Sequence, residues 1–161
     1  HASVSPLLPE EELKLKWPND LLLNGDKLAG ILLESFETTD GEGKRRRWVV
    51  VGLGMNIESA PDGMNATSLK QSGVELISAK IVLSRFIHHF IEWYGLWQDD
   101  GFEPVRKYWT NHCAHKGQKL EVQQGSRTIK GSFEGLDEEG NLLLKEGKET
   151  LTLNAGEIIL A

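Results

Sequence analysis

Residues 16–30 constrain the fold of this chain more than any other stretch. They read Lys-Trp-Pro-Asn-Asp-Leu-Leu-Leu-Asn-Gly-Asp-Lys-Leu-Ala-Gly. The pair Asn24-Gly25, set between two apolar runs, is the strongest short-range signal for a β-hairpin. The hairpin would allow the carboxylate of Asp20 to oppose the ammonium of Lys27. We therefore expect antiparallel strands that carry one pair of opposite charges.

The rest of the chain predicts further strands, then helices, then strands again. Residues 28–36 have a strand pattern, residues 38–47 are polar enough for a solvated hairpin tip, and Trp48–Val51 is a β-branched run typical of a fully buried strand. From Ser78 to Trp97 the apolar period becomes helical. The last 45 residues hold five short runs separated by glycine turns, which indicates a small β-barrel.

Composition excludes several classes of function. The 161 residues carry a formal net charge of −6 and a pI of about 5.4, which argues against a nucleic-acid-binding protein. No apolar run approaches the roughly 20 residues that span a bilayer, so we expect no membrane association. The single cysteine, Cys113, rules out an internal disulfide framework and is expected to be a small core residue in a cytoplasmic protein.

Two glycine-containing segments are the candidates for a ligand site. Lys27 precedes Gly30, where the missing side chain lets a ligand approach the backbone, and lysine acts as a mobile charge for phosphate or carboxylate. Gly52-Leu53-Gly54-Met55-Asn56 lacks the third glycine of a dinucleotide fingerprint. Its glycines would still let a flat ring lie on the backbone, and Asn56 offers a donor and an acceptor to an adenine edge. The competing interpretation is a β-bulge and a turn.

Three motifs in the same order and spacing resemble the biotin–protein ligases. They are Lys-Trp-Pro-Asn-Asp at 16–20, Lys-Leu-Ala-Gly-Ile-Leu-Leu-Glu at 27–34, and Val-Gly-Leu-Gly-Met-Asn at 51–56. The tail, with Gly-Ser-Phe-Glu-Gly-Leu-Asp at 131–137 and Gly-Asn-Leu-Leu-Leu at 140–144, is similar to the SH3-like domain of that family.

The resemblance implies an α+β fold. A mostly antiparallel sheet with helices on one face, as in class II synthetases and biotin ligases, would form residues 1–115. A small SH3-like β-barrel would form residues 116–161.

The resemblance also implies a two-step reaction, in which biotin and ATP form biotinyl-AMP and a lysine of a biotin carboxyl carrier domain then takes the biotinyl group. Lys27 matches the essential lysine of the family. Asp20 would either bind Mg²⁺ or orient the incoming amine, and both roles stay open. Positions lining the biotin pocket match Gly30, Leu32 and Gly52, and Asn56 matches an adenylate-contacting position. Residues 57–70 match the loop that orders over the adenylate.

One element of the family pattern has no counterpart here. Family members carry an arginine- and glycine-rich loop ahead of the Trp-Pro-Asn-Asp motif, and nothing in residues 1–15 matches it. We therefore expect the second part of a ligase catalytic domain, poor in transfer on its own and prone to pair with another copy as a homodimer. The alternatives are a catalytically incompetent module that only binds biotin or a carrier domain, and a related lipoate or octanoate transferase.

Overall fold

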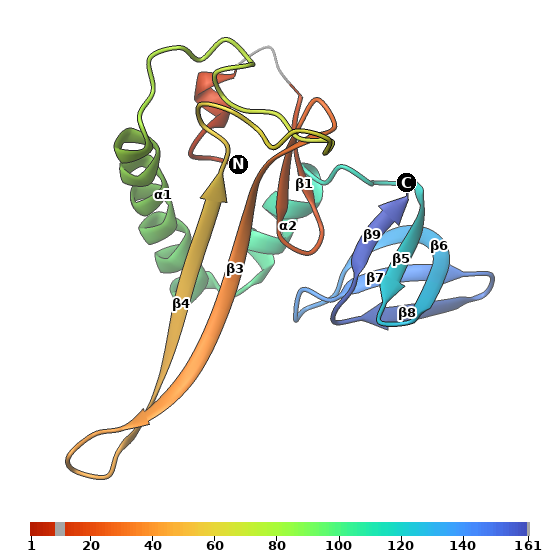
Figure 1. Ribbon diagram of the computed structural model, residues 1–161. Coiled ribbons are helices and arrows are strands. Elements are labelled where there is room, and N and C mark those ends of the chain that lie inside the picture. The colour runs from red at the N-terminus through yellow and green to blue at the C-terminus, as the bar shows by residue number, and fades with distance from the viewer. Residues whose placement is uncertain (9–11, 161) are drawn as a thin grey trace.

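The computed structural model describes residues 1–8 and 12–160 as an α+β structure with two antiparallel sheets (Figure 1). The first sheet has the order β1-β2-β3-β4. Its strands are β1 (Leu13–Lys16), β2 (Asp20–Leu23), β3 (Asp26–Thr39) and β4 (Arg45–Met55). The second sheet has the order β8-β7-β6-β5-β9 and curls into a small, separate module. Its strands are β5 (Lys119–Gln124), β6 (Arg127–Leu136), β7 (Leu142–Glu146), β8 (Glu149–Leu153) and β9 (Glu157–Leu160).

Two α-helices connect the sheets, after a short 3₁₀ helix, η1 (Ser5–Leu7), near the N-terminus. Helix α1 (Ala79–Asp100) begins after Ser78, whose hydroxyl accepts a hydrogen bond from the backbone N–H of Ile81, as expected for an N-cap. It ends at Gly101, which has φ 76°. Helix α2 (Glu103–Asn111) has a proline in its first turn. None of the helices described is long and apolar enough to cross a bilayer.

The helices lie on one face of the first sheet (Figure 1). A first hydrophobic core joins this sheet to η1, the 57–77 loop and the start of α1, through residues such as Leu23, Leu28, Leu69 and Val82. A second core fills the small module. The α+β expectation, with helices on one face and a small all-β module after them, is confirmed.

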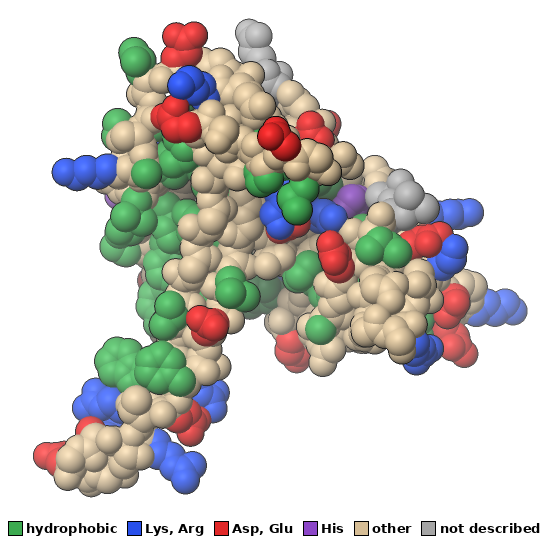
Figure 2. Space-filling model, viewed as in Figure 1, with side chains coloured by type: hydrophobic (Ala, Val, Ile, Leu, Met, Phe, Trp, Pro, Cys, Tyr) green, Lys and Arg blue, Asp and Glu red, His purple; other side chains and the backbone are tan. Residues whose placement is uncertain are grey.

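The β3–β4 hairpin differs from expectation. The predicted solvated tip at 38–47 is shorter, because β3 runs to Thr39 and β4 starts at Arg45. The prediction that Trp48–Val51 is fully buried is wrong: Trp48 is 51% exposed and Val49 is 57% exposed. An unbroken apolar run is typical of a strand covered on both faces. Here the hairpin projects as an arm beyond the helices, and apolar side chains gather on it (Figure 2).

Candidate functional site

The candidate site begins at the β2–β3 hairpin. Asn24 and Gly25 both have positive φ, 51° and 90°, which matches the type I′ turn expected of an Asn-Gly pair. The turn folds β3 back on β2, and the Nζ of Lys27 lies 2.6 Å from Oδ1 of Asp20. The Asp20 side chain is 17% exposed and the Lys27 side chain is 49% exposed, so the aspartate is the more buried partner of the ion pair.

A β-bulge places Lys27 on the same face of the sheet as Asp20. Asp20 pairs with Gly30 and Leu21 with Ala29, but Leu22 then pairs with Lys27, so Leu28 is the extra residue on β3. In a regular strand, residues three apart point to opposite faces. The bulge reverses this alternation, so Lys27 shares a face with Gly30 and Asp20.

Gly30 lies directly under the ion pair. A Cβ atom built there would lie 3.1 Å from Oδ1 of Asp20 and 3.4 Å from both Cε and Nζ of Lys27. These distances are tighter than ordinary van der Waals contact. The absence of a side chain at Gly30 therefore lets the two charged groups meet above the backbone.

Three glycines make the same face of the sheet bare. Across β3 and β4, Gly30 pairs with Gly54 and Leu32 with Gly52. Residues that pair directly in an antiparallel sheet lie on one face. Hypothetical Cβ atoms at Gly52 and Gly54 would meet nothing closer than 3.5 Å and 4.0 Å. The result is a flat floor of backbone, interrupted only by the exposed Leu32 and bordered by Lys27.

The segment after β4 closes one side of this floor. Beyond the end of β4, the backbone N–H of Lys27 donates to the carbonyl of Asn65, and the N–H of Thr67 donates to the carbonyl of Lys27. A cavity of about 540 Å³ lies between this segment and the strands. The residues lining it include Lys27, Gly30, Gly54, Asn56, Pro61 and Met64.

Asn56 fastens this segment to β3. Its Nδ2 donates to the carbonyl of Thr67 at 3.0 Å and to the carbonyl of Lys27 at 3.3 Å. An amide nitrogen carries two hydrogens, so these contacts use both. Any further ligand contact of this side chain therefore falls to Oδ1, which is an acceptor.

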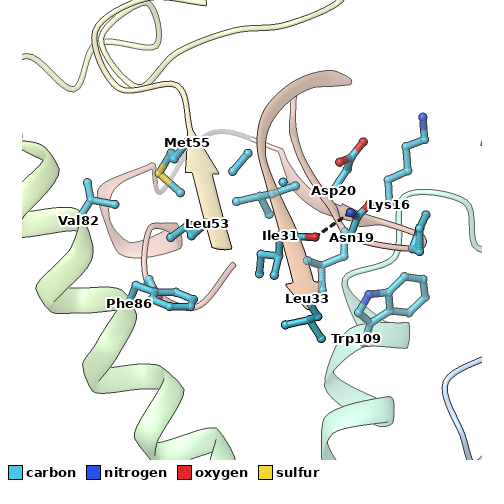
Figure 3. A pocket seen from close by; sticks show the side chains of 16 residues that line it. Lys16, Asn19, Asp20, Ile31, Leu33, Leu53, Met55, Val82, Phe86 and Trp109 are labelled. Atoms are coloured by element: carbon cyan, nitrogen blue, oxygen red, sulfur yellow. Dashed lines mark hydrogen bonds between the residues drawn. The ribbon is translucent and has the colours of Figure 1, made fainter. Parts of the chain in front are cut away.

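A second cavity, of about 270 Å³, lies on the opposite face of the sheet (Figure 3). Its walls are mostly apolar and come from β3, β4 and the two helices, with Ile31, Leu33, Leu53, Phe86 and Trp109 among them (Figure 3). Asn19 lies at its edge, where its Nδ2 donates to the carbonyl of Ile31 at 2.7 Å. Lys16, Asp20 and Gly30 also line this cavity, but Lys27 does not. Because the walls are mostly apolar and Lys27 lines the other cavity, we take the other cavity as the anion site.

The connector after α2 contains a thiol and an imidazole, but both are buried. Burial raises the pKa of the Cys113 thiol, which keeps it protonated and unsuited to act as a nucleophile. Burial also lowers the pKa of His115, although a hydrogen bond with Gln118 opposes the shift, and the charge of Lys16 adds to it. Cys113 is a core residue, as expected.

The candidate site on its own does not offer a full set of metal ligands among the described residues. Among residues 1–8 and 12–160, no group of three His, Cys, Asp or Glu side chains is placed to hold a metal. Asp20 contributes one carboxylate, and its Oδ1 already binds Lys27. Mg²⁺ at nucleotide sites takes one or two carboxylates together with phosphate oxygens and water. Asp20 alone is therefore not a complete magnesium site.

Two family models match successive parts of the chain. The one described as "Biotin/lipoate A/B protein ligase family" matches residues 2–111, and the one described as "Biotin protein ligase C terminal domain" matches residues 115–161. The chain belongs to the biotin protein ligases. The second model matches the small β module.

Individual relatives agree with this membership. A biotin–[acetyl-CoA-carboxylase] ligase of Paracoccus denitrificans is 34% identical over 157 residues, which cover 93% of this chain and 64% of that protein. The corresponding ligase of Mycobacterium tuberculosis is 31% identical, with coverage of 98% and 57%. The biotin protein ligase of Aquifex aeolicus in complex with biotin and ATP has the same fold, with a TM-score of 0.76, 21% identity, and coverage of 97% and 64%. The chain thus spans less than two thirds of these curated relatives.

The structure brings most of the predicted site residues together. Lys27, Gly30 and Asn56 line one cavity, whereas Asp20 lines the other, and its ion pair with Lys27 connects the two. Leu32 and Gly52 lie farther along the same face. Part of the 57–70 segment, which the family resemblance placed over the adenylate, also lines this cavity. Sequence reasoning missed how the segment is held: its hydrogen bonds to Lys27 use backbone groups, for which residue types give no signal.

Proposed function

We propose that this chain carries the adenylate site of an ATP-dependent biotin–protein ligase. In the first step, a carboxylate oxygen of biotin attacks the α-phosphorus of ATP, a P–O bond forms, and the bond to pyrophosphate breaks. In the second, the amine of a carrier-domain lysine attacks the acyl carbon of biotinyl-AMP, and AMP leaves.

The observation that carries this proposal is the Asp20–Lys27 pair above the glycine floor. The first step brings two anions together, so it needs a fixed cation where negative charge develops. The ammonium of Lys27 is held 2.6 Å from Asp20 and is half-exposed, so a ligand reaches it. The bare backbone at Gly30, Gly52 and Gly54 offers a flat seat for the fused rings of biotin.

Asp20 and Asn56 both contact Lys27, and we assign each a role in the reaction. Asp20 holds the Lys27 ammonium in place through the ion pair, and from the same position we expect it to orient the incoming amine. Any Mg²⁺ would come with the triphosphate and take at most the second carboxylate oxygen. We assign Oδ1 of Asn56 to accept a hydrogen bond from the amino group of adenine, since its Nδ2 is already used by two carbonyls.

The acceptor we propose is a biotin carboxyl carrier domain of a biotin-dependent carboxylase. The curated relatives named above are ligases for acetyl-CoA carboxylase. A buried, free Cys113 suits the reducing cytoplasm, where we place the protein. The exposed apolar arm of β3 and β4 favours self-association, as a homodimer, through this sheet.

The test is transfer of labelled biotin to a purified carrier domain. We expect labelling that requires ATP, and a larger yield when a segment with the arginine- and glycine-rich loop of a relative is supplied in trans. Biotin binding without pyrophosphate release under both conditions would instead identify a binding module. Faster transfer of lipoate than of biotin would identify a lipoate transferase, which the match to a biotin protein ligase C-terminal domain disfavours.

A further inference from the structure

Trp17 lies between the candidate site and the small β module. It follows β1 directly, yet its ring belongs to the core of the module, with Val122, Phe133 and Leu142. The neighbouring strand residue Leu13 belongs to the other core. Trp17 is 4% exposed. One large side chain therefore crosses from the catalytic sheet into the second module.

Two loops of the module hold this ring. The Nε1–H of Trp17 donates to the carbonyl of Gly140, in the β6–β7 turn, at 3.3 Å. At Gly156, in the β8–β9 loop, a hypothetical Cβ would lie 3.6 Å from Cζ3 of the indole. The module thus contacts both the polar and the apolar part of the ring.

Asp137 fixes the turn that presents the Gly140 carbonyl. Its Oδ1 accepts hydrogen bonds from the backbone N–H groups of Glu139 and Asn141, and its Oδ2 accepts one from the Asn141 side chain. Gly140 has φ 83°, a conformation that favours glycine. The acceptor for Trp17 is therefore held by a rigid turn.

The other end of this path is the Asp20–Lys27 pair. Only Pro18 and Asn19 separate Trp17 from Asp20. Asn19 is bonded twice to β3, since its carbonyl accepts from the N–H of Ile31 at 3.0 Å and its Nδ2 donates to the Ile31 carbonyl. A displacement of Trp17 therefore moves the turn that carries Asp20.

We propose that Trp17 is a positioning residue through which the carboxyl-terminal module sets the place of the Asn19-Asp20 turn, and with it the orientation of Lys27. The relevance to catalysis rests on the function proposed above, in which Lys27 meets the phosphate. The coupling of Trp17 to the Asn19-Asp20 turn and Lys27 does not depend on a bound ligand.

Other contacts keep the module attached when the Trp17 hydrogen bond is lost. Nη1 of Arg106, on α2, donates to the carbonyl of Leu136 at 3.2 Å. The rings of Trp109 and Phe133 have centroids 6.3 Å apart. Trp109 is thus a second tryptophan between helix and module. It lines the same cavity as Asn19 and Asp20, but among the described residues its side chain makes no hydrogen bond to that turn or to the Gly140 turn. Trp109→Phe is a matched control for Trp17→Phe.

The experiment measures two signals of the whole chain by NMR without substrate: hydrogen exchange of the Ile31 amide, and the ¹H–¹³C signal of Lys27 Cε. Loss of one hydrogen bond typically weakens protection by about fivefold. We expect Trp17→Phe to speed Ile31 exchange about fivefold and to shift the Lys27 signal. Trp109→Phe should change exchange less than twofold.

A second pair of variants tests the same path from the module side. Asp137→Ala removes the acceptor that fixes the β6–β7 turn, and we expect it to reproduce both changes although Trp17 is intact. Asp137→Asn keeps one oxygen acceptor for the two backbone amides. In this variant the Ile31 exchange rate and the Lys27 signal should therefore be close to those of the wild type.

Unchanged Ile31 and Lys27 signals in Trp17→Phe, or equal changes in Trp109→Phe, would overturn the proposal and leave Trp17 as a core residue only. These readouts need neither biotin nor ATP. A chain that bound neither ligand would therefore overturn the proposed function while the coupling result stood.

Discussion

A side chain added to the glycine floor tests whether biotin rests there. Gly52→Val is the perturbation of choice, because Gly52 lies on the glycine floor and pairs with Leu32. A Cβ at this position would lie 3.5 Å from the carbonyl oxygen of Leu32 and 3.9 Å from its Cβ. Both are ordinary contacts, so β3 and β4 should keep their register.

The magnitude follows from the space the new side chain takes. A Cβ projects about 1.5 Å from Cα and needs about 3.5–4.0 Å to a neighbouring carbon. A ring system in contact with the backbone must therefore move. Overfilling a packed contact costs about 1–3 kcal/mol. Since about 1.4 kcal/mol is a tenfold change in Kd, biotin affinity should fall about 5- to 150-fold.

The assay is titration calorimetry with biotin alone and ATP alone. We expect ATP affinity to change less than biotin affinity, and Gly52→Ala to have a smaller effect on biotin than Gly52→Val. Gly41→Val, at the tip of the same hairpin, is the control, because a Cβ there meets nothing within 4 Å. If a folded Gly52→Val variant bound biotin with wild-type affinity, the floor would not be the biotin seat.

Three further predictions concern charge, pH and association. Lys27→Ala should slow biotin-dependent pyrophosphate release about 10²- to 10³-fold in an active ligase without lowering the melting temperature; wild-type release would remove Lys27 from the reaction. Because burial lowers the pKa of His115, the unfolded state binds more protons below pH 6.5, so the free energy of unfolding should decrease as pH falls from 6.5. In His115→Gln this slope should be shallower, and urea titrations at several pH values check it. Val50→Lys, on the exposed arm, should weaken self-association in sedimentation experiments. Association equal to that of the wild type would show that the contact surface between copies does not include the arm.

The sequence was informative where local chemistry determines structure. Asn24-Gly25 specified the hairpin, and Ser78 marked the start of α1. The hairpin predicted that Asp20 and Lys27 would come near each other along neighbouring strands. Each of these features depends on residues a few positions apart, so a local pattern is enough to predict it.

The remaining features depend on tertiary contacts. The bulge at Leu28 involves no glycine or proline, so the residue types there do not predict it. The bulge nevertheless determines the face on which Lys27 lies. The apolar run at 48–51 indicates a strand but not whether anything covers it. The packing of the Trp17 ring in the second core depends on a turn more than 100 residues away in the chain, which no local pattern around Trp17 indicates.

The most direct test of the account is a crystal structure of this chain with a non-hydrolysable biotinyl-AMP analogue. The account predicts the analogue on the glycine face, with the phosphate mimic within hydrogen-bonding distance of Lys27 Nζ and the fused rings over Gly52 and Gly54. An analogue bound instead in the apolar cavity on the helix face, against Phe86 and Trp109, would contradict it.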